Sequence, residues 1–301
     1  MMTPLQLPDV PFTYRDAERA GFNRWHFRQL LESGRIRRVL CGVYQRADLP
    51  DTTEHRALAA ALVMRPFEVL RDRTAAWLHG VDTFEFRELE ILPPLETSVF
   101  RGHTRARRFG CVGGERDLRP EDVMFIQGIA VTTPLRTALD LGCRLRRRSA
   151  LAALDGFMRA HGITRQQMEA ELVRYRGRRG VVQLRELVPL ADPRAESPGE
   201  CWTRLEIIDA GLPTPIPQYW VREHGRKVFR LDLAYPMSRV AVEYDGREFH
   251  DSPEQEKADR LRRQWLREHG WTVIVVDKDS FSPEALALWL GELRSALRIA
   301  A

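Results

Sequence analysis

The stretch "VFRLDLAYPMSRVAVEYDGREFHD", residues Val228–Asp251, predicts a β-hairpin that carries an unusual set of acids. Two runs of strand-forming residues flank the turn sequence "PMSR", a pattern typical of two strands that pair in an antiparallel manner. A turn centred on Met237 and Ser238 would place Asp232 directly opposite Glu243 on the neighbouring strand. The sequence therefore predicts two carboxylates that face each other across the ladder.

The same register would gather three acids on one face of the hairpin. Arg230 would lie opposite Asp245, and Asp245 would project to the same side as Asp232 and Glu243. The opposite face would be an apolar core made of Phe229, Leu231, Leu233 and Val242. Like charges opposite each other destabilise a sheet, and a divalent cation held by Asp232 and Glu243 would offset the repulsion, because oxygen ligands suit Mg²⁺ or Mn²⁺. The alternative is that Arg230 and a neighbouring cation pair with the acids.

The order of these acids resembles the core of PD-(D/E)XK nucleases, in which an acid on a helix precedes an Asp on one hairpin strand and a Glu-x-Lys on the next. By this resemblance Glu200 matches the helical acid, Asp232 the first strand acid and Glu243 the second. Asp245 stands where that family usually has lysine, which puts the usual water-activating cation in doubt. The resemblance implies a metal-dependent nuclease in which Glu200 or Asp245 assists through water. Glu200 could equally be only the capping-box glutamate that follows Ser197.

The segment "EYDGREFHD" is also similar to the Asp-Gly-x-x-Trp-His stretch of very-short-patch mismatch endonucleases and of Vsr-like domains. Phe249 stands at the tryptophan position, and His250 matches the histidine. This resemblance covers about residues 197–297 and implies that His250 takes part in proton transfer, a role that suits a group titrating near neutrality. Alternatively, His250 only forms a hydrogen bond with the turn that precedes Ser252 and Pro253.

The helix expected after this hairpin offers candidate phosphate contacts. Its cations are Lys257, Arg260 and Arg263, and any one of them could instead belong to a solvated face. The apolar residues expected to face inward are Ala258, Leu261 and Trp265.

The first 50 residues predict two helices followed by a hairpin. Thr13 would cap the first helix, and Asn23 would cap the second, "RWHFRQLLES", which Gly34 would end. "RIRRVLCGVYQR" alternates as two strands around a turn near Cys41 and Gly42. This order is that of a winged helix-turn-helix, with a small helical subdomain as the alternative. The candidate nucleic-acid-binding residues are Asn23, Arg24, Trp25, Arg28, Arg35, Arg37 and Arg38.

The middle of the chain mixes helices and strands. We expect helices at "EHRALAAALVM" and "VLRDRTAAWLHG", strands at "LEILP" and "MFIQGIAVTT", and three further helices between Pro134 and Leu190. "FNRWHFRQLLESGRIRRVLCGVYQRA", "RDRTAAWLHGVD" and "VTTPLRTALDLG" together resemble the AbiEi antitoxin family over roughly residues 10–190. That resemblance implies DNA binding and neutralisation of a partner nucleotidyltransferase toxin.

Three domains follow from these patterns. They are a winged helix-turn-helix at 1–50, an AbiEi-like α+β domain at 51–191, and a Vsr-like PD-(D/E)XK domain at 197–301, with a mixed sheet between helices in a restriction-endonuclease-like α/β/α arrangement. The segment "PLADPRAESPGE" holds three prolines and a glycine and marks a boundary near residues 192–197. The fold class is therefore multidomain α/β.

Net charge, cysteine spacing and the distribution of apolar residues indicate which partner and which cellular location to expect. The 301 residues carry a formal net charge of +5, which weakly favours a polyanionic partner. The four cysteines are scattered without zinc or disulfide spacing, and neither a secretory signal nor an apolar run of membrane-spanning length is evident. We expect a cytoplasmic protein that does not bind membranes.

Two functions from different classes follow. The first is a DNA-binding, Mg²⁺-dependent endonuclease that acts in phage defence, in a toxin–antitoxin system or in DNA repair. The alternative is a non-catalytic AbiEi-like repressor or antitoxin whose nuclease-like domain is degenerate, as Asp245 suggests. A third hypothesis, of lower weight, is a toxin-like effector in phage defence.

Overall fold

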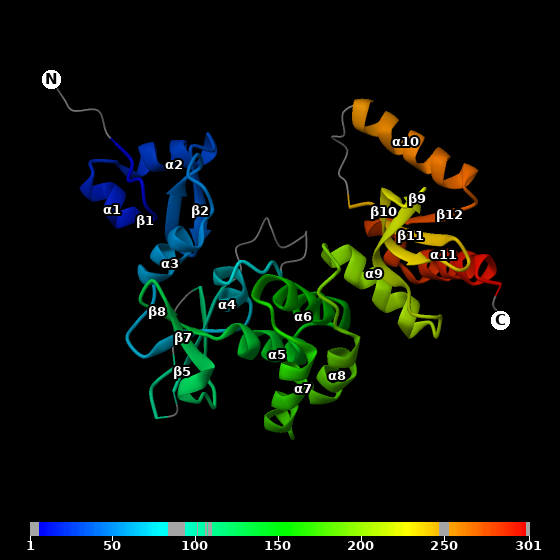
Figure 1. Cartoon of the computed structure of the whole chain (residues 1–301). Helices are drawn as coiled ribbons and strands as arrows, with labels where there is room; N and C mark the ends of the chain where they lie inside the picture. Colours follow the sequence, from blue (N-terminus) through cyan, green and yellow to red (C-terminus); the bar gives the residue numbers. More distant parts are fainter. Residues whose placement is uncertain are drawn as a thin grey trace. The chain divides into compact units, whose positions relative to one another are not determined.

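The computed structural model describes residues 6–83, 94–100, 102–105, 107, 110–246 and 253–298, and for residues 253–259 it describes the backbone only. The chain divides into two compact units, Met1–Leu141 and Gly142–Ala301, called unit 1 and unit 2 below (Figure 1). Both units combine helices with sheets, so the chain is a multidomain α/β protein, as its sequence predicts. None of the described helices has the length and apolar character needed to span a membrane.

Unit 1 begins with a module of two helices and a hairpin, which we call the N-terminal module. Its elements are β1 (Phe12–Thr13), α1 (Tyr14–Arg19), α2 (Arg24–Glu32), β2 (Ile36–Leu40) and β3 (Val43–Arg46), with the strands in the order β1-β3-β2. Thr13 caps α1 in a capping box with Asp16, and the Asn23 side chain accepts a hydrogen bond from the backbone of α2. Gly34, which follows the C-cap residue Ser33 of α2, has φ of +68°. The predicted caps, helix end and Cys41-Gly42 turn are thus confirmed.

The rest of unit 1 is a five-stranded mixed sheet with helices. Its elements are α3 (Thr53–Ala61), β4 (Glu68–Leu70), α4 (Asp72–Leu78), β5 (Leu95–Val99), β6 (Cys111–Glu115), η2 (Pro120–Asp122), β7 (Val123–Ile126), β8 (Ile129–Thr132) and α5 (Pro134–Arg144), which runs into unit 2. The sheet order is β6-β5-β4-β8-β7. The prediction of one helix over "VLRDRTAAWLHG" is wrong at its start, because Val69 and Leu70 are fully buried and pair with β5. The predicted strand "LEILP" lies outside the described residues.

Unit 2 begins with helices and ends in a four-stranded sheet. Its elements are α6 (Arg147–His161), α7 (Arg165–Glu171), η3 (Leu172–Tyr175), α8 (Val181–Leu187), η4 (Val188–Leu190), α9 (Pro198–Asp209), β9 (Ile216–Glu223), β10 (Arg226–Tyr235), β11 (Val240–Tyr244), α10 (Pro253–Glu268), β12 (Thr272–Val276), η5 (Lys278–Phe281) and α11 (Pro283–Ala296). The strand order is β12-β11-β10-β9, with β11 and β12 parallel and the other pairs antiparallel. Figure 1 shows α10 on one side of this sheet and α9 and α11 on the other.

Both faces of this sheet are buried, so the prediction of a single apolar face on the hairpin is wrong. Leu233 and Val242 pack with Ile207 of α9 and with the side chains of α11. Phe229 and Leu231 instead pack on the α10 side. Phe229 and Leu231, which regular pleating would place on the same face as Leu233, thus belong to a different core from Leu233.

The boundary predicted near residues 192–197 does not coincide with the division between the units. Helix α9 packs against α6, and Arg204 of α9 forms an ion pair with Asp155 of α6 at 2.6 Å. Both side chains are buried, and Asp155 also accepts a hydrogen bond from the backbone of Asp192 at 2.7 Å. The proline-rich stretch is thus held on the helices that precede it.

Candidate functional site

The hairpin of β10 and β11 has the predicted register. Leu233 pairs with Val242 and Tyr235 with Val240, and the same register continued by one residue brings Asp232 opposite Glu243. The carboxylate of Asp232 accepts a hydrogen bond from the backbone N–H of Tyr244 at 3.0 Å.

Glu200 of α9 joins these two acids. Ser197 caps α9 by accepting a hydrogen bond from the backbone of Glu200 at 3.2 Å. The Glu200 carboxylate itself accepts from the backbone of Glu196 at 2.9 Å and from the side chain of Gln218 on β9 at 2.8 Å. Glu200 is buried, so its backbone takes part in the cap while its carboxylate points at the sheet. Ser197 thus caps α9, but the Glu200 carboxylate accepts from Glu196 and Gln218 and does not complete the predicted capping box.

The three acids affect one another electrostatically. The pKa of Asp232 is raised to about 7, first by burial and then by the negative charges of Glu200 and Glu243, against the lowering effects of the hydrogen bond from Tyr244 and the charge of Arg262. A carboxyl group with a pKa near 7 can hold or release a proton at neutral pH. The cluster of Glu200, Asp232 and Glu243 is called the acidic cluster below.

Arg262 of α10 neutralises part of the acidic cluster. Its guanidinium donates to both carboxylate oxygens of Glu243, at 2.9 Å to Oε2 and at a shorter distance to Oε1, and to the backbone oxygen of Arg230 at 2.8 Å. Sequence reasoning missed Arg262, because Leu261 was expected to face inward. Leu261 is 57% exposed, whereas Leu266 is fully buried, so the inward face of α10 passes through Arg262.

The other site residues predicted on the hairpin and on α10 either have partners outside the acidic cluster or lie outside the described part of the chain. The carboxylate of Asp245 lies 3.3 Å from Arg263, so this candidate phosphate contact pairs with an acid. The side chain of Arg230 pairs with Glu196 at 2.6 Å rather than with Asp245. Arg260 is exposed. His250 lies outside the described residues, and Lys257 belongs to the part of α10 whose side chains are not described.

The donors available to a metal ion differ from those predicted. Both oxygens of Glu243 are engaged by Arg262, so Glu243 does not fit a metal ligand in this arrangement. Among the described residues no group of three or more His, Cys, Asp or Glu side chains is placed to hold an ion. Asp232 fits the role, and beside it Gln218 has a buried Oε1 atom without a hydrogen-bond partner. A cation site here would therefore rest on Asp232 and on the Gln218 amide oxygen.

The predicted nucleic-acid-binding residues lie on the outer surface of the N-terminal module. Phe27 and Leu30 of α2 are buried in the core of the module, while Arg24, Trp25 and Arg28 are exposed, Trp25 to 65%. Arg28 pairs with Glu32 at 2.7 Å, and the Asn23 side chain is used by the cap. Of the hairpin arginines, Arg35 and Arg38 are exposed and Arg37 is half-buried.

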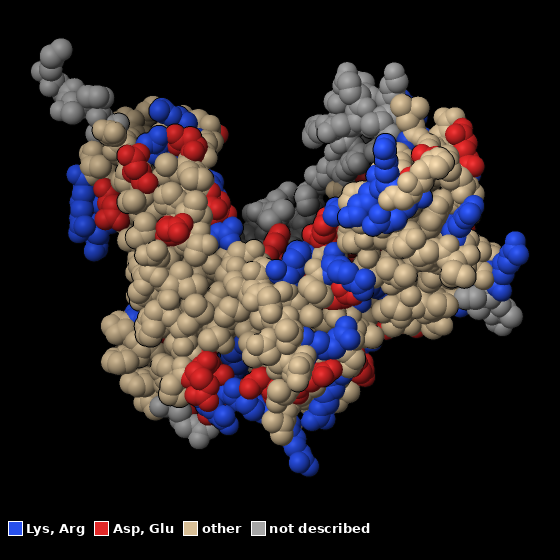
Figure 2. Space-filling model, viewed as in Figure 1, with Lys and Arg blue, Asp and Glu red and all other residues tan. Residues whose placement is uncertain are grey.

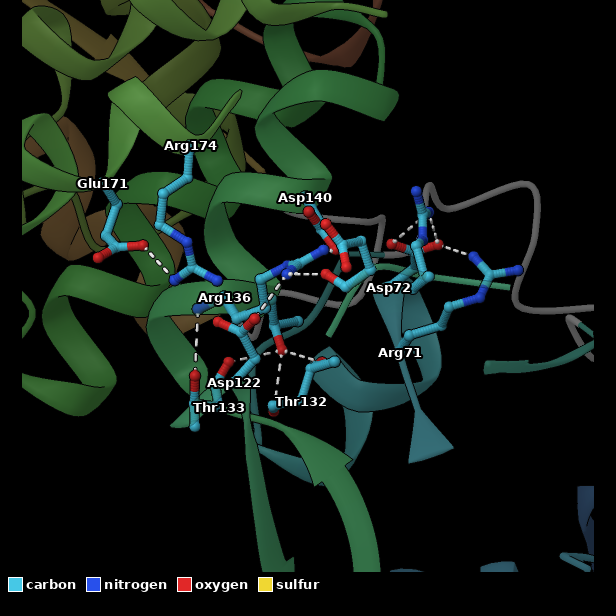
Figure 3. A network of polar contacts seen from close by, with 12 residues as sticks. Arg71, Asp72, Asp122, Thr132, Thr133, Arg136, Asp140, Glu171 and Arg174 are labelled. Atoms are coloured by element: carbon cyan, nitrogen blue, oxygen red, sulfur yellow. Dashed lines mark hydrogen bonds and ion pairs between the residues drawn. The ribbon is translucent and has the colours of Figure 1, made fainter. Parts of the chain in front are cut away.

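The segments "RDRTAAWLHGVD" and "VTTPLRTALDLG", which carry the AbiEi resemblance, contribute to a buried ionic network in unit 1 (Figure 3). Arg136 of α5 lies between two buried acids, with its Nε atom 3.0 Å from Asp140 and its Nη1 atom 2.9 Å from Asp122. Asp72, buried and with φ of +51°, pairs with Arg71 and, at 3.0 Å, with Arg116. The spacing of Arg136 and Asp140, four residues apart on one helix, was the signal from which this network could have been predicted.

One comparison with known proteins matches the middle region, and two others align with most of the chain. Residues 60–190 match the family described as "AbiEi antitoxin C-terminal domain". Two proteins of Mycobacterium tuberculosis, "Uncharacterized protein MT2308" of strain CDC 1551 / Oshkosh and "Uncharacterized protein Rv2248" of strain ATCC 25618 / H37Rv, are each 37% identical to the chain over 263 residues. Each alignment covers 85% of this chain and 92% of the mycobacterial protein. The nuclease resemblance of residues 197–297 stays a prediction.

Proposed function

We propose that the chain, which belongs to the same protein family as the two mycobacterial proteins and matches the AbiEi antitoxin C-terminal domain over residues 60–190, is a DNA-binding antitoxin of the AbiEi type. The N-terminal module acts as a winged helix-turn-helix, represses transcription at the protein's own promoter, and works together with a domain that neutralises a nucleotidyltransferase toxin. The supporting observation is the exposed face of α2, where Arg24, Trp25 and Arg28 lie outside the apolar core of the module.

This face has the chemistry of a recognition helix. Arginine can pair with phosphate or with the acceptor atoms of guanine in two hydrogen bonds, and a helix fits the major groove. The N-terminus of α2 adds backbone N–H groups, of which one is already taken by Asn23. The hairpin arginines Arg35 and Arg38, both exposed, serve as backbone contacts beside the helix.

Footprinting on the DNA upstream of the protein's own gene tests the repressor function. The wild-type chain should protect a discrete site, and the R24A/R28A variant should not. The R65A/R119A variant removes two exposed arginines of unit 1 outside the N-terminal module and should protect the site like wild type. Loss of toxicity when the chain is produced together with a nucleotidyltransferase encoded beside it tests the antitoxin function.

A second function, a metal-dependent endonuclease of the Vsr-like PD-(D/E)XK type, is supported by the acidic cluster. Glu200, Asp232 and Glu243 come from the elements that the resemblance requires. Burial and then the charges of Glu200 and Glu243 raise the pKa of Asp232 to about 7, and a cation would stabilise the charged carboxylate. Asp232 would hold Mg²⁺ or Mn²⁺, with the Gln218 amide oxygen as an additional donor. The chemistry that such an ion supplies when bound is activation of a water and neutralisation of phosphate charge. Glu243 takes part only if Arg262 moves to the substrate phosphate.

Nicking of plasmid DNA in Mg²⁺ or Mn²⁺ tests this second function. Wild type should nick, and D232A should lose at least about a hundredfold of the rate, because it removes the charge that holds the ion. The D279N variant removes an exposed carboxylate of unit 2 and should nick like wild type. Equal rates for wild type and D232A would leave the chain a binding protein with a nuclease-like fold.

A further inference from the structure

The hairpin of β9 and β10 carries an exposed tryptophan among cations. Trp220 of β9 is 37% exposed and pairs in register with Arg230 of β10. Two residues further along β9, beyond the pair of Val221 and Phe229 and a register shift in β10, Arg222 pairs with Lys227. The Lys227 ammonium lies 4.9 Å and the Arg230 guanidinium 6.0 Å from the centre of the Trp220 ring. These four residues, Trp220, Arg222, Lys227 and Arg230, are called the hairpin platform below.

Packing does not account for the position of Trp220. The neighbouring Tyr219 packs toward Trp271, with ring centres 6.1 Å apart, and Val221 belongs to the core under α10. Trp220 alternates with these residues and so points to the other side of the strand. In the described part of the chain its ring is met by cations and by no other aromatic ring. A large apolar side chain with an accessible face is therefore presented to solvent.

The charge of the hairpin platform is only partly balanced. Arg230 pairs with Glu196, but Arg222 donates to the backbone oxygen of Gly225 and Lys227 contacts the tryptophan ring. Neither Arg222 nor Lys227 has an acidic partner among the described residues. Figure 2 shows lysine and arginine side chains gathered over the part of unit 2 where Figure 1 places β9 and β10. The surface is thus positive around an aromatic face.

The hairpin platform leads along the same two strands to the acidic cluster. Gln218 lies two residues before Trp220 on β9 and donates to Glu200. Asp232 lies two residues after Arg230 on β10, beside Gln218 in the register of the hairpin. One hairpin thus carries the hairpin platform, with cations suited to phosphates and a ring suited to a base, and next to it Asp232, whose pKa is near 7.

We propose that the hairpin platform binds single-stranded DNA, with one unpaired base stacked on Trp220 and the adjoining phosphates on Arg222, Lys227 and Arg230. A base in a duplex has both faces covered by its neighbours, so the exposed ring selects an unpaired base. The incoming base takes the place of Lys227 over the ring, and the released ammonium contacts a phosphate. The assignment to DNA rests on the proposed DNA-binding function, whereas the platform itself is separate from the N-terminal module.

Anisotropy of a labelled oligothymidylate of about 15 nucleotides, a length that covers one binding surface, tests the proposal in the full chain. W220A should weaken binding at least about fivefold, because stacking of one base contributes about 1–3 kcal/mol, and W220F should retain most of the affinity. R222E/K227E should weaken binding and reduce the slope of log affinity against log salt by about 1.4, or about 0.7 for each phosphate that the variant no longer neutralises. R176E/R185E makes the same change of charge at two exposed positions of unit 2 and should leave the affinity within about threefold of wild type.

The outcomes separate this proposal from the proposed function. R24A/R28A should lose affinity for the promoter duplex and bind the oligothymidylate like wild type. W220A should bind the promoter duplex like wild type and lose affinity for the oligothymidylate. No binding of the oligothymidylate by wild type, equal affinity of W220A and wild type, or equal weakening by R176E/R185E would overturn the platform. Tighter binding of oligouridylate than of oligothymidylate would identify RNA as the occupant instead. Displacement of the DNA by a polyglutamate peptide from wild type but not from W220A would identify an acidic protein.

Discussion

Asp232 is a carboxyl group that the fold places beside two others. Its burial and the charges of Glu200 and Glu243 hold its pKa at about 7, against the ordinary value of 3.8. The folded protein therefore binds a proton on Asp232 between these two pH values, where the unfolded chain has already released it. Stability falls as the pH rises through this window, and above pH 7 the full penalty is present.

Replacing Asp232 by asparagine should remove that penalty. At pH 8 the D232N variant should be more stable than wild type by on the order of 2–4 kcal/mol, because the shift spans about three pKa units. Near pH 4 the two proteins should differ little. Urea unfolding at pH 4.5, 6 and 8 measures both. The D279N control alters an exposed acid, and a gain in stability equal to that of D232N would show that the effect is one of net charge.

At the scale of elements, the acidic cluster depends on how closely α9 approaches β11. A side-chain carbon at Gly199 would lie 2.1 Å from the Tyr244 ring, which leaves no room for one. Gly199 thus lets the first turn of α9 lie against the strand end, with Glu200 next to it on the helix and the Tyr244 backbone bound to Asp232. This close approach holds the helical acid and the strand acid together.

The G199A variant should push Tyr244 aside. We expect a loss of about 1–3 kcal/mol of unfolding free energy from overpacking, together with lower activity or ion binding at the acidic cluster. Gly291 of α11 has no atom within 4 Å of an added side-chain carbon, so G291A should be neutral or stabilising by about 0.5–1 kcal/mol. Urea unfolding of both variants measures the difference, and equal stabilities would contradict the close packing of Gly199.

The local elements of the site could be predicted from the sequence, but their partners could not. Turn residues and strand alternation are local features, so the sequence could predict the register of the hairpin. The pairs next to Asp232 and Glu243 confirm the register in which these two residues lie opposite each other. The inward face of α10 depends on the charge of the strand that it packs against. Glu243 forms an ion pair with Arg262, and the apolar Leu261 is exposed instead. The ion pairs of Arg136 with Asp122 and of Arg204 with Asp155 likewise join residues that are 14 and 49 positions apart in the sequence.

At the scale of the whole molecule, the helices of residues 147–190 belong with the C-terminal sheet. Cutting the chain at the proline-rich stretch would separate Arg204 from Asp155, both of which are buried. A buried charge that loses its partner costs about 3–5 kcal/mol. Residues 60–190 match one family and yet divide between the two units, so the limits of a family match are not those of a compact unit.

Two fragments test this division. A fragment of residues 142–301 should unfold cooperatively, whereas a fragment of residues 197–301 should lack a cooperative transition, because α9 would expose the face that packs on α6. Thermal unfolding followed by circular dichroism distinguishes them. A shorter fragment as stable as the longer one would instead support the predicted domain boundary near residues 192–197.

The central claim is that the N-terminal module binds DNA through the outer face of α2. The affinity of the full chain for its promoter duplex, measured between about 50 mM and about 200 mM salt, tests this claim most directly. The R24A/R28A variant should bind at least about tenfold more weakly than wild type, with a slope of log affinity against log salt that is smaller by about 1.8, or about 0.9 for each phosphate left without its arginine. The same affinity and slope in R24A/R28A as in wild type would contradict the claim.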